Sequence, residues 1–97
     1  MAKDEHVRIV SKGAEAIAAW RSERPDAQLD LSGAALRRAD LVHANLNGAN
    51  LRGTNFEWAD LRWADAIGAD FSGSNLARAD FHKSDLHAAS FRSANLN

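Results

Sequence analysis

A large apolar residue returns at every fifth position of this chain from Leu31 onward. A small residue stands two positions before almost every one of them, and Asp or Asn commonly lies between the two. Fourteen positions carry this apolar residue, and all except Ala66 are Leu or Phe: Leu31, Leu36, Leu41, Leu46, Leu51, Phe56, Leu61, Ala66, Phe71, Leu76, Phe81, Leu86, Phe91 and Leu96. The register continues without a break, so one structural unit must repeat along residues 29–97.

A period of five residues fits neither a continuous helix nor a continuous strand. Five residues advance an α-helix by roughly 500°, which would spread the apolar residues around its axis. An odd period on a strand would place alternate members on opposite faces. Within one unit, however, a short extended stretch points the small and the large residue inward and the Asp or Asn outward. If the remaining two residues turn the chain by a quarter circle, four units close one square coil, and coils stack roughly 4.8 Å apart.

Glycine marks the turns of only two of the four sides. It follows the large residue by two positions at Gly33, Gly48, Gly53, Gly68 and Gly73. A type II turn needs a positive φ at its third residue, where glycine is least strained. Because the other two sides carry Arg, Trp, His or Lys at this place, the sequence predicts type II turns along two sides and a different turn along the other two.

The units ADLVH at 39–43, ANLNG at 44–48 and ANLRG at 49–53 resemble the pentapeptide-repeat family, whose pattern is A-(D/N)-L-x-x. The resemblance covers residues 29–97. It implies an all-β solenoid, namely a right-handed quadrilateral β-helix, which would here have about three and a half coils. It implies little about function, because most members of the family have no known biochemical role.

Residues 1–28 have a different pattern, that of an amphipathic helix. Apolar residues recur at spacings of three and four at Val7, Val10, Ala14, Ile17 and Ala18. Gly13 should divide the segment, with a main helix over about 14–24 that Pro25 ends. Arg21 lies on the apolar side, and we expect its head to reach water. Since the end of a solenoid exposes core side chains and unpaired backbone, we expect this segment to cap the first coil; the alternative is that the helix itself binds a partner.

The other end of the solenoid carries no such segment. The sequence stops at Leu96 and Asn97, half a coil into a new layer. Either the chain is cut from a longer protein, or the end with Phe91 and Leu96 pairs with a second copy of the chain in a homodimer. A twofold dimer through C-terminal coils also resembles what some family members form.

Two outward tryptophans provide the candidate interaction surface, which consists of Trp58, Trp63, Arg38 and Arg78. Arg38 and Arg78 should lie above and below Trp58, since they are twenty positions away from it, and cation–π contacts are then expected. Exposed tryptophan beside arginine is typical of residues that dominate binding to another protein. The alternative is that these side chains only stack on one another along the solenoid.

The outward aspartates form a column at Asp40, Asp60 and Asp80. Such a stripe could imitate the phosphates of DNA, and Arg38 and Arg78 are placed to offset its repulsion. The alternative is that Asp and Asn side chains bind the local backbone. Residues 29–97 hold eight acidic and seven basic residues, whereas the family members that act on DNA gyrase as DNA mimics are strongly acidic. Modulation of gyrase therefore remains the second hypothesis, and binding of nucleic acid itself is not expected.

The sequence offers nothing for catalysis, metal binding or membrane insertion. It has no cysteine, its His residues do not converge, no G-x-S-x-G or phosphate loop occurs, and Leu and Phe fill the interior. No apolar run approaches 18 residues and the start lacks a signal-peptide core, which favours the cytoplasm. The sequence therefore predicts a protein-interaction or structural scaffold that is not an enzyme, has no cofactor and binds an unidentified protein partner.

Overall fold

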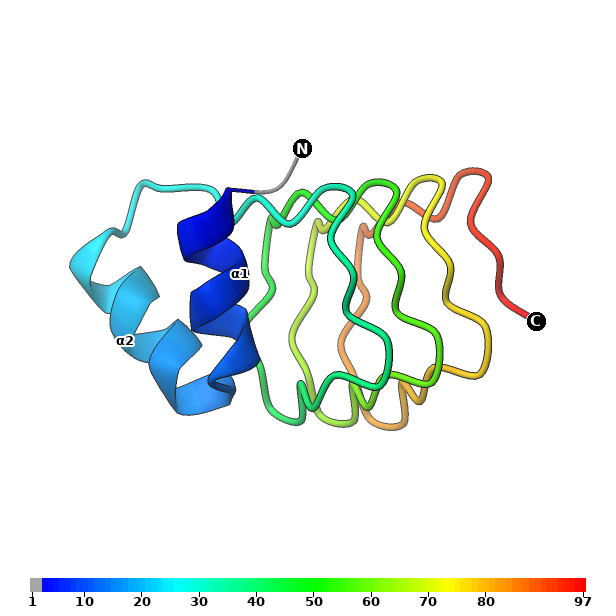
Figure 1. Ribbon diagram of the computed structural model, residues 1–97, viewed down its shortest axis with the longest axis horizontal. Coiled ribbons are helices and arrows are strands. Elements are labelled where there is room, and N and C mark those ends of the chain that lie inside the picture. Colours follow the sequence, from blue (N-terminus) through cyan, green and yellow to red (C-terminus); the bar gives the residue numbers. More distant parts are fainter. Residues whose placement is uncertain (1–2) are drawn as a thin grey trace.

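The computed structural model describes residues 3–97 as two helices followed by a stack of coils (Figure 1). Helix α1 spans Asp4–Ser11 and helix α2 spans Ala14–Glu23. The two helices lie side by side at one end of the stack, and the C-terminus lies at the other end. The first parallel bridge is at Asp30, one residue before Leu31, where the apolar period of five residues begins.

Parallel bridges between residues twenty positions apart join each coil to the next. They pair Asp30 with Asn50, Ala35 with Asn55, Asp40 with Asp60, Asn45 with Asp65, Asn50 with Asp70, Asn55 with Asn75, Asp60 with Asp80, Asp65 with Asp85, Asp70 with Ser90 and Asn75 with Asn95. Every bridge is a single residue long, and within residues 3–97 no side extends into a longer strand. The chain is therefore a solenoid of twenty-residue coils whose sides are only long enough for one bridge each.

The same set of backbone hydrogen bonds repeats at every level of the stack. At Asp60, the N–H donates to the carbonyl of Ala39 at 2.9 Å, and the carbonyl accepts from the N–H of Leu41 at 2.8 Å. The turn residue His43 adds a third bond, because its N–H donates to the carbonyl of Arg62 at 3.0 Å. Each side of each inner coil is thus hydrogen-bonded to the coil before it and to the coil after it.

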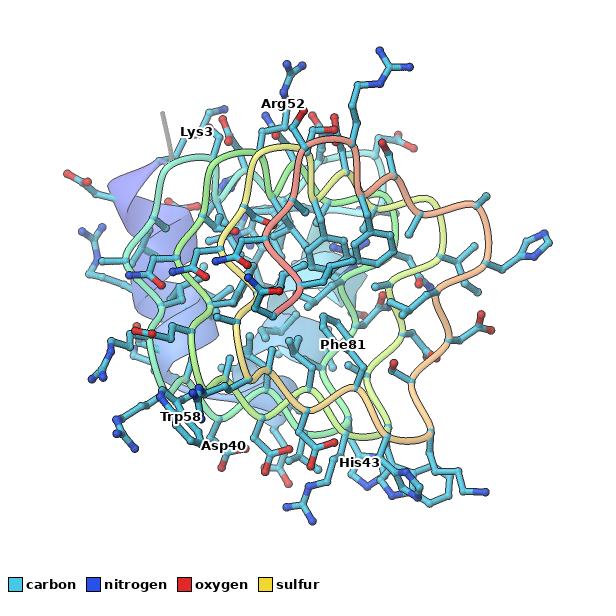
Figure 2. All side chains as sticks on the ribbon, turned by 90° about the vertical axis from the view of Figure 1, so that its right-hand side faces the viewer. Lys3, Asp40, His43, Arg52, Trp58 and Phe81 are labelled. Carbon is cyan, nitrogen blue, oxygen red and sulfur yellow. The ribbon has the colours of Figure 1, made fainter. Side chains whose placement is uncertain are left out.

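The large apolar residues fill the inside of the coils, as the sequence predicts. Leu41 and Leu61 are fully buried, and Phe81 follows them in the last coil, where Figure 2 shows its ring inside the backbone. The rings of Phe71 and Phe91, one coil apart, stack with centroids 5.0 Å apart and an interplanar angle of 3°. Since burial of one such side chain stabilises a fold by about 1.5–3 kcal/mol, these columns supply the main apolar contribution.

The turns are alike on all four sides, so the prediction of a second kind of turn is wrong. After each large residue, the N–H of the next small residue donates back to its carbonyl, as from Ala39 to Leu36 at 3.0 Å and from Ala34 to Leu31 at 2.9 Å. The residue before the small one has positive φ whether it is Gly33 (72°) or Arg38 (62°). The left-handed conformation costs a residue with a side chain about 1–2 kcal/mol. The hydrogen bonds to both neighbouring coils hold the backbone in that conformation in spite of the cost.

The helical segment begins and ends close to the predicted residues and departs from the prediction at two of them: Ala18, expected on the apolar face, is exposed, and Arg21 makes an unexpected contact. Gly13, with φ of 96°, separates α1 from α2, and α2 ends at Glu23, just before Pro25. Val10 and Ile17 are buried against the coils. The head of Arg21 does not reach water as expected; it donates through Nη2 to the backbone carbonyl of Asn47, and burial lowers its pKa. The free carbonyls at the edge of the first coil are the physical reason, since they attract the nearest cation.

We predict opposite effects on stability for two turn substitutions. Gly53→Ala should lower the free energy of unfolding by about 1 kcal/mol, because φ is 65° there and an added Cβ would meet no atom within 4 Å. Ala88→Gly should raise it by about 0.5–1 kcal/mol, because Ala88 is held at φ of 61°. Urea unfolding at pH 7 measures both. Equal stability of the two variants would show that the backbone is not left-handed at these turns.

Candidate functional site

One side of the solenoid gathers both exposed tryptophans. We call it the tryptophan face. Figure 2 shows Trp58, Asp40 and His43 along one edge of the coils. The face has a central column of aspartates and a column of large side chains at each flanking turn. Its members, in columns of residues twenty positions apart, are Arg38, Trp58 and Arg78; Asp40, Asp60 and Asp80; and His43, Trp63 and Lys83.

Trp58 lies between two arginines, and the predicted stack is present. The Cζ atoms of Arg38 and Arg78 lie 5.6 Å and 5.1 Å from the centroid of its ring. Contacts of this kind contribute about 0.5–1 kcal/mol each at exposed positions. The ring nevertheless remains 44% exposed. The stack therefore orients the indole without removing it from solvent.

Trp63 lies at the opposite flank and is more exposed, at 53%. The ring of His43 stacks on it with a centroid distance of 6.0 Å and an interplanar angle of 17°. Lys83 occupies the same turn position in the following coil. Trp63 thus has an aromatic neighbour in one adjacent coil and a cationic residue in the other, and most of its apolar surface faces solvent.

The backbone does not explain why tryptophan occupies these positions. The φ angles of Trp58 and Trp63 are 62° and 63°, in the left-handed region where glycine is least strained. A glycine would serve the turn better, as Gly53 does at the same place on another side. The two exposed tryptophans of the face therefore stand at turns whose backbone conformation disfavours them.

The aspartates of the central column bind the local backbone, which was the alternative to imitation of DNA phosphates in the sequence analysis. Oδ1 of Asp40 accepts from the N–H of Val42 at 3.2 Å, and Oδ1 of Asp80 accepts from the N–H of His82 at 2.9 Å. The same bond to the N–H two residues later recurs at Asp30, Asn45, Asn50, Asn55, Asp60, Asp70, Asn75, Asp85 and Asn95. These side chains therefore complete the turns on every side of the solenoid.

The prediction that Arg38 and Arg78 offset the acidic column is wrong. They lie on Trp58, and the cation within the column is Arg62, which the sequence analysis did not single out. Its Nε and Nη2 bind Oδ1 and Oδ2 of Asp60 at 2.8 Å and 2.7 Å, and its Nε is 3.9 Å from Oδ2 of Asp80. The sequence feature that could have indicated this contact is the position of Arg62 two residues after Asp60, because the turn brings a side chain at that position back over the aspartate.

Hydrogen bonds hold the pKa of two aspartates below the usual range. At Asp60 the bond from the Arg62 side chain has the largest effect and outweighs the opposite effect of burial. At Asp70 the hydroxyl and then the N–H of Ser72 do the same, helped by the charge of Arg52. Both carboxylates are therefore ionised near neutral pH, and the tryptophan face carries charges of both signs side by side.

The second candidate surface of the sequence analysis lies at the far end of the stack. Leu96 is 62% exposed, and Phe91 is half-buried beside it. Phe81 and Leu86, from the other two sides of the last coil, are half-buried as well. This open end, made of Phe81, Leu86, Phe91 and Leu96, is distant from the helices and presents four apolar side chains together with the edge of a coil.

Within residues 3–97, no three His, Asp or Glu side chains lie close enough together to hold a metal ion. Neither α1 nor α2 has the length and apolar character needed to cross a bilayer.

The stack of five-residue units with one aromatic and charged side defines the class: a β-solenoid with a candidate binding face. Comparison with protein-family models identifies the family. The model described as Pentapeptide repeats (8 copies) matches residues 30–65 and 59–97. The chain therefore belongs to the pentapeptide-repeat family, as its sequence pattern indicates.

Solved structures of other pentapeptide repeat proteins are similar to this chain. HetL, a pentapeptide repeat protein involved in heterocyst differentiation regulation in the cyanobacterium Nostoc, is 40% identical, with a TM-score of 0.48 over 68% of this chain and 33% of HetL. A pentapeptide repeat protein of the Arabidopsis thaliana thylakoid lumen is 33% identical, with a TM-score of 0.45 over 70% of this chain and 58% of its own. Another Nostoc pentapeptide repeat protein is 27% identical, with a TM-score of 0.50 over 88% of this chain and 97% of its own.

This chain thus spans only a part of the first two proteins, one third of HetL and 58% of the thylakoid protein. A search of curated proteins finds no match.

We predict that stability falls in acid because of the lowered pKa values of Asp60 and Asp70. A carboxyl group whose pKa is lower in the folded state stabilises the fold above its unfolded pKa of about 3.9, and this contribution is lost as the pH falls through the folded pKa. The thermal midpoint, followed by circular dichroism, should stay level near neutral pH and fall below about pH 4. The variant Asp60→Asn/Asp70→Asn should show a shallower fall. A midpoint that rises in acid would contradict the assignment.

Proposed function

We propose that this protein is a scaffold without enzymatic activity that binds another protein through the tryptophan face. The observation that carries the proposal is the exposure of Trp58 and Trp63, at 44% and 53%, on the two flanks of one side. Tryptophan and arginine are the residues that most often dominate the energy of a protein interface. Here they occur together, with Arg38 and Arg78 already ordered against Trp58.

The rigidity of the face supports the same conclusion. A side chain that is immobilised on binding costs about 0.5–1.5 kcal/mol, and preorganisation avoids that cost. Trp63 stacks on His43, and Arg62 is fixed on Asp60 by two hydrogen bonds. The face therefore offers aromatic surface between ordered charges, and it would lose little conformational freedom when a partner covers it.

The proposal also covers the handedness of the solenoid, its number of coils and the role of its two helices. We take the coils as a right-handed quadrilateral β-helix of about three and a half coils, with α1 and α2 as its N-terminal cap. Support comes from the four turns in each twenty-residue coil and from the contacts of Val10, Ile17 and Arg21 with the coils. The helices then cover part of the first coil and stabilise the solenoid.

The charges of the face do not favour mimicry of DNA. A mimic of duplex DNA needs a continuous row of negative charge, because recognition of DNA depends on its phosphates. Here Arg62 lies on Asp60 and near Asp80, and the flanking columns add Arg38, Arg78 and Lys83. We therefore place the binding energy in the tryptophans and not in an acidic stripe, and gyrase is not the partner that this face fits.

A second function is supported by the open end. Leu96 is 62% exposed beside three half-buried apolar side chains, and apolar coil edges associate readily. We propose that the 97-residue chain forms a twofold dimer through Phe91 and Leu96. The tryptophan face lies along the stack and not on its end, so it would remain accessible in such a dimer.

The tryptophan face is tested with the variant Trp58→Ser/Trp63→Ser and the control Ile67→Ser. Ile67 is an apolar residue of similar exposure, 40%, on another side of the coils. We expect partners recovered by affinity purification with quantitative mass spectrometry to bind the control as they bind the unchanged chain. The double variant should bind at least about tenfold more weakly, the loss of about 1.4 kcal/mol or more expected for interface tryptophans.

Circular dichroism should show that both variants fold. A partner that binds the double variant and the control equally well would exclude the tryptophan face as its binding site.

The open end is tested by light scattering at two protein concentrations. The unchanged chain should have the mass of a dimer at the higher concentration, and Leu96→Lys should be a monomer at both, because the dimer would bury an unpaired charge. Ile67→Lys, a charge at an apolar position on a side of the stack, is the control and should remain dimeric. A monomeric mass for the unchanged chain at both concentrations would contradict the dimer.

A further inference from the structure

The first coil has a backbone edge that no earlier coil covers. In later coils the middle residue of each side uses both backbone groups toward the preceding coil, as Asn55 does: its N–H donates to Ala34 at 2.9 Å and its carbonyl accepts from Leu36 at 2.8 Å. In the first coil the corresponding residues are Asp30, Ala35, Asp40 and Asn45. Their N–H and carbonyl groups point toward the end of the stack where the helices lie.

The helical segment covers only part of this edge. The N–H of Asp30 donates to Nδ1 of His6 at 2.8 Å, and its carbonyl accepts from the N–H of Lys3 at 3.3 Å. Arg21 donates to the carbonyl of Asn47, on the side adjacent to Asp30. By contrast, the backbone N–H and carbonyl groups of Ala35 and Asp40 have no hydrogen-bond partner within residues 3–97.

A cavity of about 320 Å³ lies along this uncovered stretch. The corner between α1 and α2 forms one wall with Lys12, and the coil edge with Ala35 and Asp40 forms the other. Val10 and Leu36, which are almost fully buried, also line it and make it apolar at its base. The exposure of Ala39 agrees with this: it is partly exposed, whereas Ala59, at the equivalent inward position of the next coil, is buried.

The charges around the cavity indicate the sign of the charge that an occupant would carry. Arg37 is paired, since its Nε lies 2.8 Å from Oε1 of Glu57 in the next coil. Lys12 forms no ion pair within the described part of the chain. Asp40 also lines the cavity, but its Oδ1 accepts from the N–H of Val42 and its charge acts on Arg62. Lys12 is therefore the cation at the rim without an ion pair in residues 3–97, and it favours an acidic side chain.

We propose that this edge is a docking site for an extended acidic segment of another polypeptide, which adds to the first coil as a short strand. Its backbone would pair with the N–H and carbonyl groups of Ala35, bend with the turn at residues 36–39, and pair with those of Asp40 on the next side, as segments added to an open sheet edge do. One apolar side chain would enter the cavity over Val10 and Leu36, and an acidic residue would face Lys12. The site lies at the opposite end from the open end and does not depend on the tryptophans.

A segment fits this edge better than a coil of a second copy. A complete coil would pair with all four sides, and α1 and α2 occupy the space above Asp30 and Asn47. Of the first-coil residues whose backbone groups have no partner in residues 3–97, Ala35 and Asp40 line the cavity and Asn45 does not. The stretch beside the cavity accommodates a few residues.

The test uses the full chain labelled with nitrogen-15 and a synthetic peptide with blocked ends in which Val alternates with Asp. On titration, the amide signals of Ala35, Arg37 and Asp40 should shift, and hydrogen exchange at the N–H of Ala35 and Asp40 should slow at least tenfold. A peptide in which Val alternates with Lys should bind at least about tenfold more weakly. Binding of the two peptides with equal affinity would overturn the acidic assignment.

Two variants distinguish the cavity from other surfaces. Ala39→Phe should fill the cavity and abolish binding, whereas Ala79→Phe, at the far end of the same column, should leave it unchanged. Lys12→Glu changes only an exposed side chain. It should weaken the binding of the acidic peptide and strengthen the binding of the basic one. The proposal is overturned by shifts at Trp58 and Trp63 in place of Ala35 and Asp40, by no shift at millimolar peptide, or by protection of Ala35 and Asp40 that depends on protein concentration without peptide.

Discussion

Hydrogen bonds between residues about twenty positions apart hold every other feature of this chain in place. Each side of a coil makes a single bridge, as between Asp40 and Asp60, and one bridge cannot stabilise a strand by itself. The coils are stable only because each lies between two others and because Leu and Phe columns fill the space inside them. Stability in such a solenoid is a sum over neighbouring coils, which explains why its two ends differ from its middle.

The same hydrogen bonds fix the conformation of the turns whichever side chains the turns present to solvent. They hold Trp58, Trp63 and Arg38 in the left-handed conformation although none of these residues favours it. The fold therefore places few limits on the outward side chain of a turn, and large residues can be presented there. At the ends the relation is reversed: where a neighbouring coil is missing, backbone groups such as those of Ala35 remain unpaired and become possible contacts in their own right.

The five-residue period was sufficient to predict the solenoid and its inner columns, because these depend on which residues must face inward. The break at Gly13 was predicted separately, from the helical spacing of apolar residues before the repeats and the glycine that interrupts it. The period did not predict the uniform turns, since the conformation of Arg38 is imposed by a coil twenty residues away and not by its own preference. It paired the aspartates with the wrong arginines, because the choice between Trp58 and Asp80 depends on side-chain rotamers. The five-residue period also did not predict the cavity beside Lys12, because no sequence period specifies which sides of the first coil the helices leave uncovered.

Scalar couplings across hydrogen bonds measure the central claim directly. In the labelled protein, nuclear magnetic resonance should detect coupling from the amide nitrogen of Leu41 to the carbonyl carbon of Asp60, and from Asp60 to Ala39. These pairs define the stacking of one coil on the next. Couplings from either amide to a carbonyl four residues earlier would indicate a helix in this region and would contradict the account.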